Sequence, residues 1–178
     1  MKPCYLFLTK GFEEIEAVAT IDILRRAGLD LKTVSVEETL EVEAAHGVVI
    51  KADMLLSEGD FSEAEILILP GGTLRLGEFP KLIDLLRNQN ACQGWIAAIC
   101  AAPSILGRIG LLDGREATAY PGFEENLTGA MVSNKRVVVS DNIITGKGPG
   151  CTMEFALKIV ETLCGEPTAN TLADGLIM

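Results

Sequence analysis

The sequence predicts an α/β protein in which a mostly parallel sheet is covered by helices on both faces. Short unbroken aliphatic runs, typical of strands buried on both faces, alternate along the chain with segments of helical period. Of the 178 residues, 48% are hydrophobic and only 5% are aromatic, a composition that suits aliphatic strands packed beneath helices. Because no internal repeat, low-complexity tract or linker interrupts the chain, we expect one domain over residues 1–178.

The first half of the chain carries strand, helix and hairpin patterns in turn. Apolar runs that end near glycine or proline predict three strands, at Cys4–Thr9, Leu31–Val36 and Glu65–Leu69. Helical period predicts a helix over Glu13–Ala27, closed by Gly28. Two short extended pieces within Leu40–Ile50 predict a hairpin around His46-Gly47.

The second half repeats the alternation of helix and strand. Helical patterns predict three helices, at Lys81–Asn90, Ala101–Ile109 and Thr152–Leu163. A buried strand is expected at Trp95–Ile99, and a hairpin joins Val137–Ser140 to Ile143–Thr145. Since ligands of such folds bind beyond the carboxyl ends of the strands, we expect the functional residues just after them.

The charge and cysteine content exclude several classes of function. A net charge of −10 without a basic stripe would repel phosphate backbones and anionic lipids, so we expect no nucleic-acid or membrane partner. The amino terminus has no secretory pattern, and no apolar stretch reaches the roughly 18 residues of a membrane helix. The five cysteines lack CxxC or Cys/His spacing, which predicts free thiols in the cytoplasm, without a metal ion or cofactor.

The segment from Gly94 to Pro103 contains the strongest candidate for a reactive residue. An apolar strand runs directly into Cys100, then into small residues and a proline suited to the first turn of a helix. This is the layout of a nucleophile elbow, and the start of the following helix would lower the pKa of the thiol. The alternative is an unreactive buried cysteine, which we favour for the four that lack this context, Cys4, Cys92, Cys151 and Cys164.

Glu16 and a glycine turn are expected to complete the site. Glu16 interrupts apolar positions at the start of the first helix, so we expect burial to raise its pKa and keep it protonated, able to donate to a thiolate. Compensation of the helix dipole is the alternative explanation for acidic residues there. Gly71 and Gly72 follow a buried strand, where their N–H groups and that of Ala101 would form an oxyanion hole, unless the glycines make only a plain turn.

Five motifs follow one another in a characteristic order. They are Lys10-Gly11-Phe12-Glu13-Glu14-Ile15-Glu16, Leu24-Arg25-Arg26-Ala27-Gly28, Leu69-Pro70-Gly71-Gly72, Ala97-Ala98-Ile99-Cys100-Ala101-Ala102-Pro103, and Gly148-Pro149-Gly150 with Glu154-Phe155-Ala156-Leu157. Over essentially the whole chain the sequence resembles the DJ-one/ThiJ/PfpI superfamily, in its DJ-one branch. The resemblance implies a flavodoxin-like three-layer sandwich related to class I glutamine amidotransferases, usually a homodimer. It also implies a reactive Cys100, a protonated Glu16, and oxyanion donors at Gly72 and Ala101.

The resemblance implies a stress-response protein in which Cys100 and Glu16 act on a reactive carbonyl such as methylglyoxal, as a glutathione-independent glyoxalase or a deglycase. The alternative is a redox sensor or chaperone in which peroxide oxidises Cys100 to sulfinic acid. A PfpI-type peptidase or amidase is less expected, because Tyr120 replaces a histidine of many relatives and tyrosine is a poor base at neutral pH. His46 and Arg26 are candidates to reach the partner subunit's Cys100, although a solvated surface position is the alternative for His46.

Overall fold

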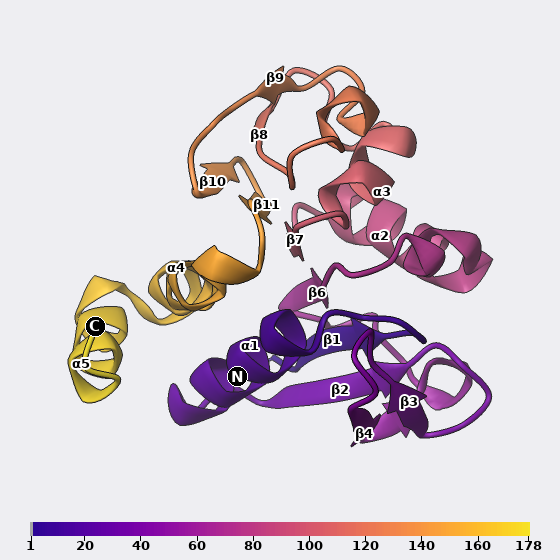
Figure 1. The fold of residues 1–178 in the computed structure, drawn as a ribbon, viewed down its shortest axis with the longest axis horizontal. Helices are drawn as coiled ribbons and strands as arrows, with labels where there is room; N and C mark the ends of the chain where they lie inside the picture. The colour runs from indigo at the N-terminus through magenta and orange to yellow at the C-terminus, as the bar shows by residue number, and fades with distance from the viewer. Residues whose placement is uncertain (1) are drawn as a thin grey trace.

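Unbroken aliphatic segments form the centre of a seven-stranded sheet in the computed structural model, which describes residues 2–178 (Figure 1). The strands lie in the order β10-β11-β7-β6-β1-β2-β5, and each neighbouring pair is parallel except β10 and β11. Their bounds are Cys4–Leu8 (β1), Leu31–Ser35 (β2), Met54–Leu55 (β5), Ile66–Leu69 (β6), Trp95–Ile99 (β7), Val137–Ser140 (β10) and Ile143–Gly146 (β11). β1 and β6 are buried along their whole length, as expected for strands covered on both faces.

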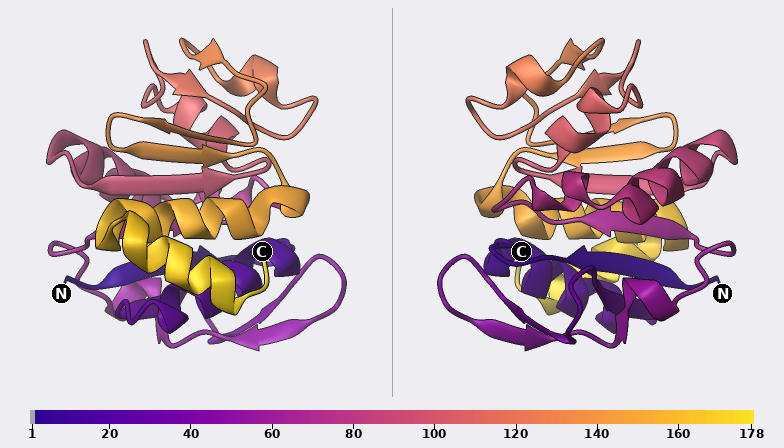
Figure 2. Two further views of the ribbon diagram at one scale, coloured as in Figure 1. Left: turned by 90° about the vertical axis from the view of Figure 1, so that its left-hand side faces the viewer. Right: turned by 90° about the vertical axis from the view of Figure 1, so that its right-hand side faces the viewer.

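Helices form a layer on each face of this sheet. The bounds of the helices are Glu14–Arg26 (α1), Pro80–Ala91 (α2), Pro103–Arg108 (α3), Thr152–Cys164 (α4) and Glu166–Gly175 (α5). α1 and α4 lie on one face with α5 packed against α4, and α2 and α3 lie on the other face (Figure 2). The side chains of β1 alternate between the two layers, because Leu6 and Leu8 belong to the core cluster of α1 and α4 while Phe7 belongs to that of α2 and α3. The predicted three-layer α/β sandwich is confirmed.

Short elements connect the main ones. β3 (Glu41–Glu43) and β4 (Val49–Lys51) form the antiparallel hairpin expected from the sequence. β8 (Glu116–Ala117) pairs with β9 (Met131–Val132), and single 3₁₀ turns lie at Leu56–Glu58, Arg75–Glu78, Glu124–Asn126 and Pro149–Cys151. The prediction of a helix from Ala101 is wrong by two residues, because the chain first turns sharply at Cys100 and Pro103 then occupies the start of α3.

The carboxyl ends of β1, β6, β7 and β11 meet at one edge of the sheet. Their following loops are bonded to one another, since the N–H of Glu13 donates to the carbonyl of Gly71 at 2.9 Å and the N–H of Cys100 donates to the carbonyl of Gly146 at 2.9 Å. This is the edge where parallel sheets bind ligands. Within residues 2–178, no helix is both long enough and apolar enough to cross a membrane.

Candidate functional site

Cys100 occupies a sharp turn between β7 and α3. Its φ is +67°, a left-handed conformation that costs a residue with a side chain free energy and that is retained only where its surroundings enforce it. Here the N–H of Cys100 donates to Gly146, and its carbonyl accepts a 2.9 Å hydrogen bond from the N–H of Tyr120. The residue is 9% exposed, so Cys100 is nearly buried at this edge of the sheet.

Glu16 reaches the same point from the first turn of α1. It is fully buried, and its Oε2 accepts a 2.7 Å hydrogen bond from the N–H of Gly71. Its other oxygen, Oε1, is buried without a hydrogen-bond partner among the described residues. Glu13 caps the helix by accepting the N–H of Glu16 at 2.8 Å, and its own N–H bond to the carbonyl of Gly71 holds the start of α1 against the loop after β6.

Two glycines allow the loop after β6 to approach Cys100. A Cβ on Gly71 would lie 2.6 Å from the Cβ of Cys100 and 2.9 Å from Oε2 of Glu16, so only a hydrogen fits there. Gly72 has a φ of +86°, and a Cβ at that position would overlap the backbone of Glu13. With glycine at both positions, the N–H of Gly71 binds Glu16 and the N–H of Gly72 faces the sulfur of Cys100.

Burial has the largest effect on the pKa of Glu16. It raises the pKa of this carboxyl to about 7, against the hydrogen bond from the N–H of Gly71 and the effect of the nearby Cys100 thiol, while the charge of Glu13 raises it further. Burial and a raised pKa agree with what the apolar neighbours of Glu16 predict. Near neutral pH this carboxyl therefore exchanges readily between its protonated and ionised forms.

The prediction of a lowered thiol pKa at Cys100 is wrong. Burial raises the pKa of this thiol to about 12, and the negative charge of the nearby Glu16 raises it too, whereas the N–H groups of Ala101 and Gly72 lower it. The contributions from Glu16 require its ionised form, because a protonated carboxyl would donate to the sulfur instead. Above pH 7 the negative charge of this pair therefore lies on Glu16, and the carboxylate is the group near Cys100 that could accept its proton.

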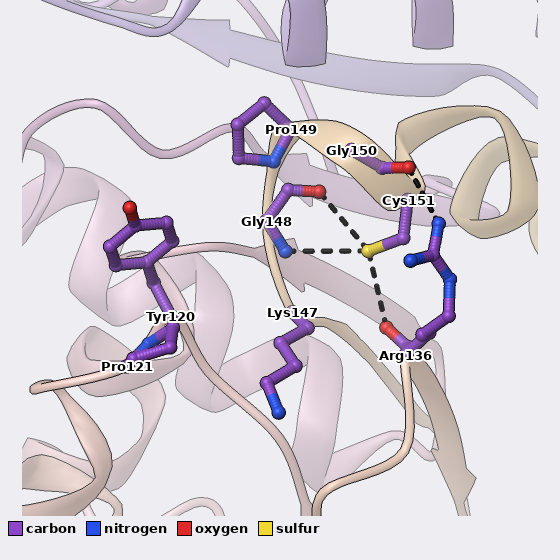
Figure 3. A pocket seen from close by; sticks show the side chains of 8 residues that line it. All are labelled: Tyr120, Pro121, Arg136, Lys147, Gly148, Pro149, Gly150 and Cys151. Atoms are coloured by element: carbon purple, nitrogen blue, oxygen red, sulfur yellow. Dashed lines mark hydrogen bonds between the residues drawn. The ribbon is translucent and has the colours of Figure 1, made fainter.

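Tyr120 lies beside this centre, at the rim of a hollow of about 270 Å³ (Figure 3). Its side chain is 45% exposed, and a Cβ on Gly148 would touch its ring at 3.0 Å. The residues that line the hollow are Tyr120, Pro121, Arg136, Lys147, Gly148, Pro149, Gly150 and Cys151. No sequence motif points to Lys147 or Arg136. The position of Lys147 directly after a strand, at the ligand-binding edge, is the one signal that could have indicated it.

His46 and Arg26 make contacts on the surface of their own chain. Nδ1 of His46 lies 3.0 Å from the carboxylate of Glu14, which raises the pKa of the imidazole, and Nε of Arg26 lies 2.7 Å from Asp22. The structure does not bring either one to Cys100 within the chain, so their reach across a dimer stays a prediction. Glu13, Glu14 and His46 form the one group of possible metal ligands found among residues 2–178, and the helix cap and this ion pair account for their proximity.

Relatives of known name match most of the chain. Protein dj-1beta of Drosophila melanogaster is 36% identical over 99% of this chain and 97% of its own length. Glutathione-independent glyoxalase DJR-1.2 of Caenorhabditis elegans is 38% identical, over 93% of this chain and 90% of its own length. Protein DJ-1 homolog A of Arabidopsis thaliana is 40% identical over 96% of this chain, which spans only 45% of that longer protein.

The fold has equally clear counterparts. The oxidized DJ-1 of Toxoplasma gondii superposes with a TM-score of 0.94 at 37% identity, covering 99% of this chain and 98% of the other. Residues 2–162 match the DJ-1/PfpI family. By sequence and by architecture, the chain belongs to the DJ-1/PfpI family.

Proposed function

We propose that this chain is a glutathione-independent glyoxalase that converts small α-oxoaldehydes such as methylglyoxal into α-hydroxy acids. Cys100 is the nucleophile, and Glu16 moves the protons. The observation that carries the proposal is a buried acid with a pKa near 7 beside a thiol at a strained turn, which pairs a nucleophile with a base suited to neutral pH. The name of the Caenorhabditis elegans relative supports the same reaction.

The first step is addition of Cys100 to the aldehyde. Ionised Glu16 takes the thiol proton while sulfur bonds to the aldehyde carbon, and the carbonyl electron pair moves onto oxygen. The N–H groups of Gly72 and Ala101, which face the sulfur, stabilise this oxyanion. Glu16 then returns its proton to that oxygen, which gives a neutral hemithioacetal and an ionised Glu16. A deglycase would use the same addition.

The second step moves hydrogen between the two oxidised carbons. Glu16 removes the proton from the former aldehyde carbon, the C–H electron pair forms the double bond of an enediol, and the ketone electron pair moves onto the ketone oxygen, which receives that proton from Glu16. Glu16 then takes the proton of the hydroxyl beside sulfur, the carbonyl reforms at that carbon, and the electron pair of the double bond accepts the proton at the adjacent carbon, which leaves a thioester. Water hydrolyses the thioester and frees the thiol of Cys100. Methylglyoxal and one water thus become lactic acid, and no external oxidant or reductant is needed.

Lactate formation from methylglyoxal without glutathione tests this proposal. We expect kcat/KM to rise as Glu16 ionises, with an apparent pKa of about 7. Cys100→Ser and Glu16→Gln should each lower kcat/KM by roughly a hundredfold or more. Cys92→Ser is the matched control, because Cys92 is exposed and should tolerate the change. Lactate formation by Cys100→Ser at the wild-type rate would exclude the proposal.

Redox sensing is a second candidate, favoured by the unpartnered Oε1 of Glu16. Peroxide would oxidise the sulfur of Cys100 to sulfenic and then sulfinic acid, and a protonated Glu16 would donate to an added oxygen. The oxidized state of the Toxoplasma gondii DJ-1 structure supports this reading. Treatment with hydrogen peroxide and mass spectrometry separates the candidates: two added oxygens on Cys100 in a protein that forms no lactate would favour the sensor.

We also propose that the chain forms a homodimer through α1. Ile15 and Val18 on this helix and Met153 on α4 are more than 40% exposed, and Ile15 and Met153 line one shallow hollow with Met178. Apolar side chains gathered in this way are typical of a surface that another molecule covers. Light scattering at micromolar concentration should give twice the chain mass, and Ile15→Asp should halve it. A monomeric wild type would leave His46 and Arg26 no route to the partner subunit's Cys100.

A further inference from the structure

The hollow beside Tyr120 is built from segments that also hold the backbone of Cys100. One wall contains Tyr120, whose N–H donates to the carbonyl of Cys100, and the other begins directly after Gly146, whose carbonyl accepts the N–H of Cys100. Figure 3 shows Tyr120 and Pro121 facing the segment that starts at Lys147. The hollow therefore adjoins the proposed nucleophile and has more room than a three-carbon aldehyde needs.

Of the two cationic side chains that line the hollow, only one forms an ion pair. Arg136 is neutralised, because its Nε lies 2.9 Å from both carboxylate oxygens of Glu154 and a terminal nitrogen donates to the carbonyl of Gly150 at 2.6 Å. The ammonium of Lys147 makes only 3.5 Å contacts with the oxygens of Asn134, and no carboxylate among residues 2–178 lies within ion-pair distance of it.

The loop after Tyr120 contains a carboxylate, that of Glu124, which interacts electrostatically with Lys147. Hydrogen bonds from its own N–H and from the N–H of Gly122, the latter at 2.6 Å, hold the pKa of Glu124 below its usual value, and the charge of Lys147 lowers it further. In a chain of net charge −10, the hollow thus presents one positive charge without a close partner. A single free ammonium matches a single negative charge, such as that of a carboxylate.

We propose that this hollow binds a carboxylate on the substrate, through Lys147, so that the preferred substrates are α-oxoaldehydes that carry a carboxylate. This inference rests on the proposed function only in taking Cys100 as the reacting group. Lys147 is a specificity-determining residue, because it acts on the charged part of the substrate and not on the reacting carbon.

Two alkylating reagents of nearly equal size test the charge directly. Iodoacetate and iodoacetamide react with a thiol in the same way, but only iodoacetate carries a carboxylate. The ratio of their rates at Cys100, followed by mass spectrometry, cancels any change in thiol acidity and reports the field at the reacting carbon. Lys147→Gln should lower the iodoacetate to iodoacetamide ratio by roughly threefold to tenfold. Lys147→Arg should keep the ratio.

Lys32→Gln is the matched control, because Lys32 is exposed near the start of β2, away from the carboxyl edge, and should leave the ratio unchanged. High salt should reduce the difference in ratio between the wild type and Lys147→Gln by screening the charge of Lys147. A ratio that is the same in wild type and Lys147→Gln at low salt, or a difference that high salt leaves unchanged, would overturn the carboxylate site. Alkylation of Cys100 without any lactate from methylglyoxal would instead contradict the proposed function, and the ratio would still decide the role of Lys147.

Discussion

Cys100 and Cys151 occupy similar places in the fold but have different surroundings. Each follows one of two neighbouring parallel strands, β7 and β11, each precedes a helix, and both are buried. The sulfur of Cys151 is bonded only to backbone, accepting from the N–H of Gly148 at 3.3 Å and lying 3.1 Å from the carbonyl of Gly148 and 3.3 Å from that of Arg136. The sulfur of Cys100 faces two N–H groups and a buried carboxyl.

Their backbones differ as well. Cys151 has a φ of −117°, in the ordinary range, whereas Cys100 is held at +67°. A buried position after a strand therefore does not by itself fix the chemical surroundings of a cysteine. The difference lies in the acid that reaches Cys100 from α1 and in the glycines that let it approach.

Replacing Glu16 should have the largest effect, which is a change in how the free energy of unfolding depends on pH. The pKa of Glu16 is raised from 4.5 to about 7, so the folded state binds more protons than the unfolded state between these values, and stability falls as pH rises through that window. Relative to Glu16→Gln, the wild type should lose up to about 3 kcal/mol of unfolding free energy between pH 4 and pH 8. Urea unfolding at several pH values measures this. Parallel pH curves for the two proteins would show that Glu16 is not the buried acid described here.

A methyl group added between the acid and the thiol should affect Cys100 but not Cys151. Gly71→Ala places a Cβ against Cys100 and Glu16, which should cost about 1–3 kcal/mol of unfolding free energy and slow alkylation of Cys100 but not of Cys151. The control is Gly175→Ala, where a new Cβ meets nothing within 4 Å. Equal stability of the two variants would mean that the approach of the loop after β6 is looser than the structure has it.

The acidity of Cys100 should respond to the charge of Glu16. Because the carboxylate raises the pKa of the thiol, Glu16→Gln should lower it by roughly one unit or more while keeping a donor beside the sulfur. Thiolate absorbance titrated against pH in a protein whose other cysteines are serine gives the value. A rise in pKa would show instead that a protonated Glu16 stabilises the thiolate in the wild type.

The smallest effect is expected from Cys151, whose sulfur contacts only backbone groups. Cys151→Ala removes a buried sulfur and its backbone hydrogen bonds, which should cost about 1 kcal/mol of unfolding free energy and leave lactate formation within about threefold of wild type. Thermal unfolding together with the lactate assay checks both halves. Loss of lactate formation at unchanged stability would give Cys151 a part in the reaction.

Patterns local in sequence predicted most of the fold. Aliphatic runs located β1, β2, β6 and β7, and the hairpins β3-β4 and β10-β11 followed from their turns. α5 was not predicted, because Gly165 and Pro167 resemble a helix end; only the spacing of Ala169, Leu172 and Leu176, whose side chains join the core cluster with α4, indicates it. β8 and β9 have two residues each, too few to show a period.

The candidate site also has parts that the sequence predicts and parts that depend on the folded structure. Cys100 and Glu16 stand out because each breaks a local pattern at the end of a strand or the start of a helix. The direction of the thiol pKa could not be predicted, since it depends on how deeply the sulfur is buried and on the charge of a residue 84 positions away (100 − 16). Lys147 was missed because the absence of a counter-charge near a cation is a property of the folded chain, not of its sequence.

Competition among the five thiols tests the central claim most directly. Iodoacetamide at limiting concentration near pH 7.5, followed by peptide mass spectrometry, ranks their reactivity in one experiment. We predict that Cys100 carries the first label although its thiol pKa is raised and Cys92 is more exposed, because an ionised Glu16 takes the thiol proton as the sulfur reacts. First labelling of Cys92 or Cys151 would contradict the claim that Cys100 and Glu16 form the reactive centre.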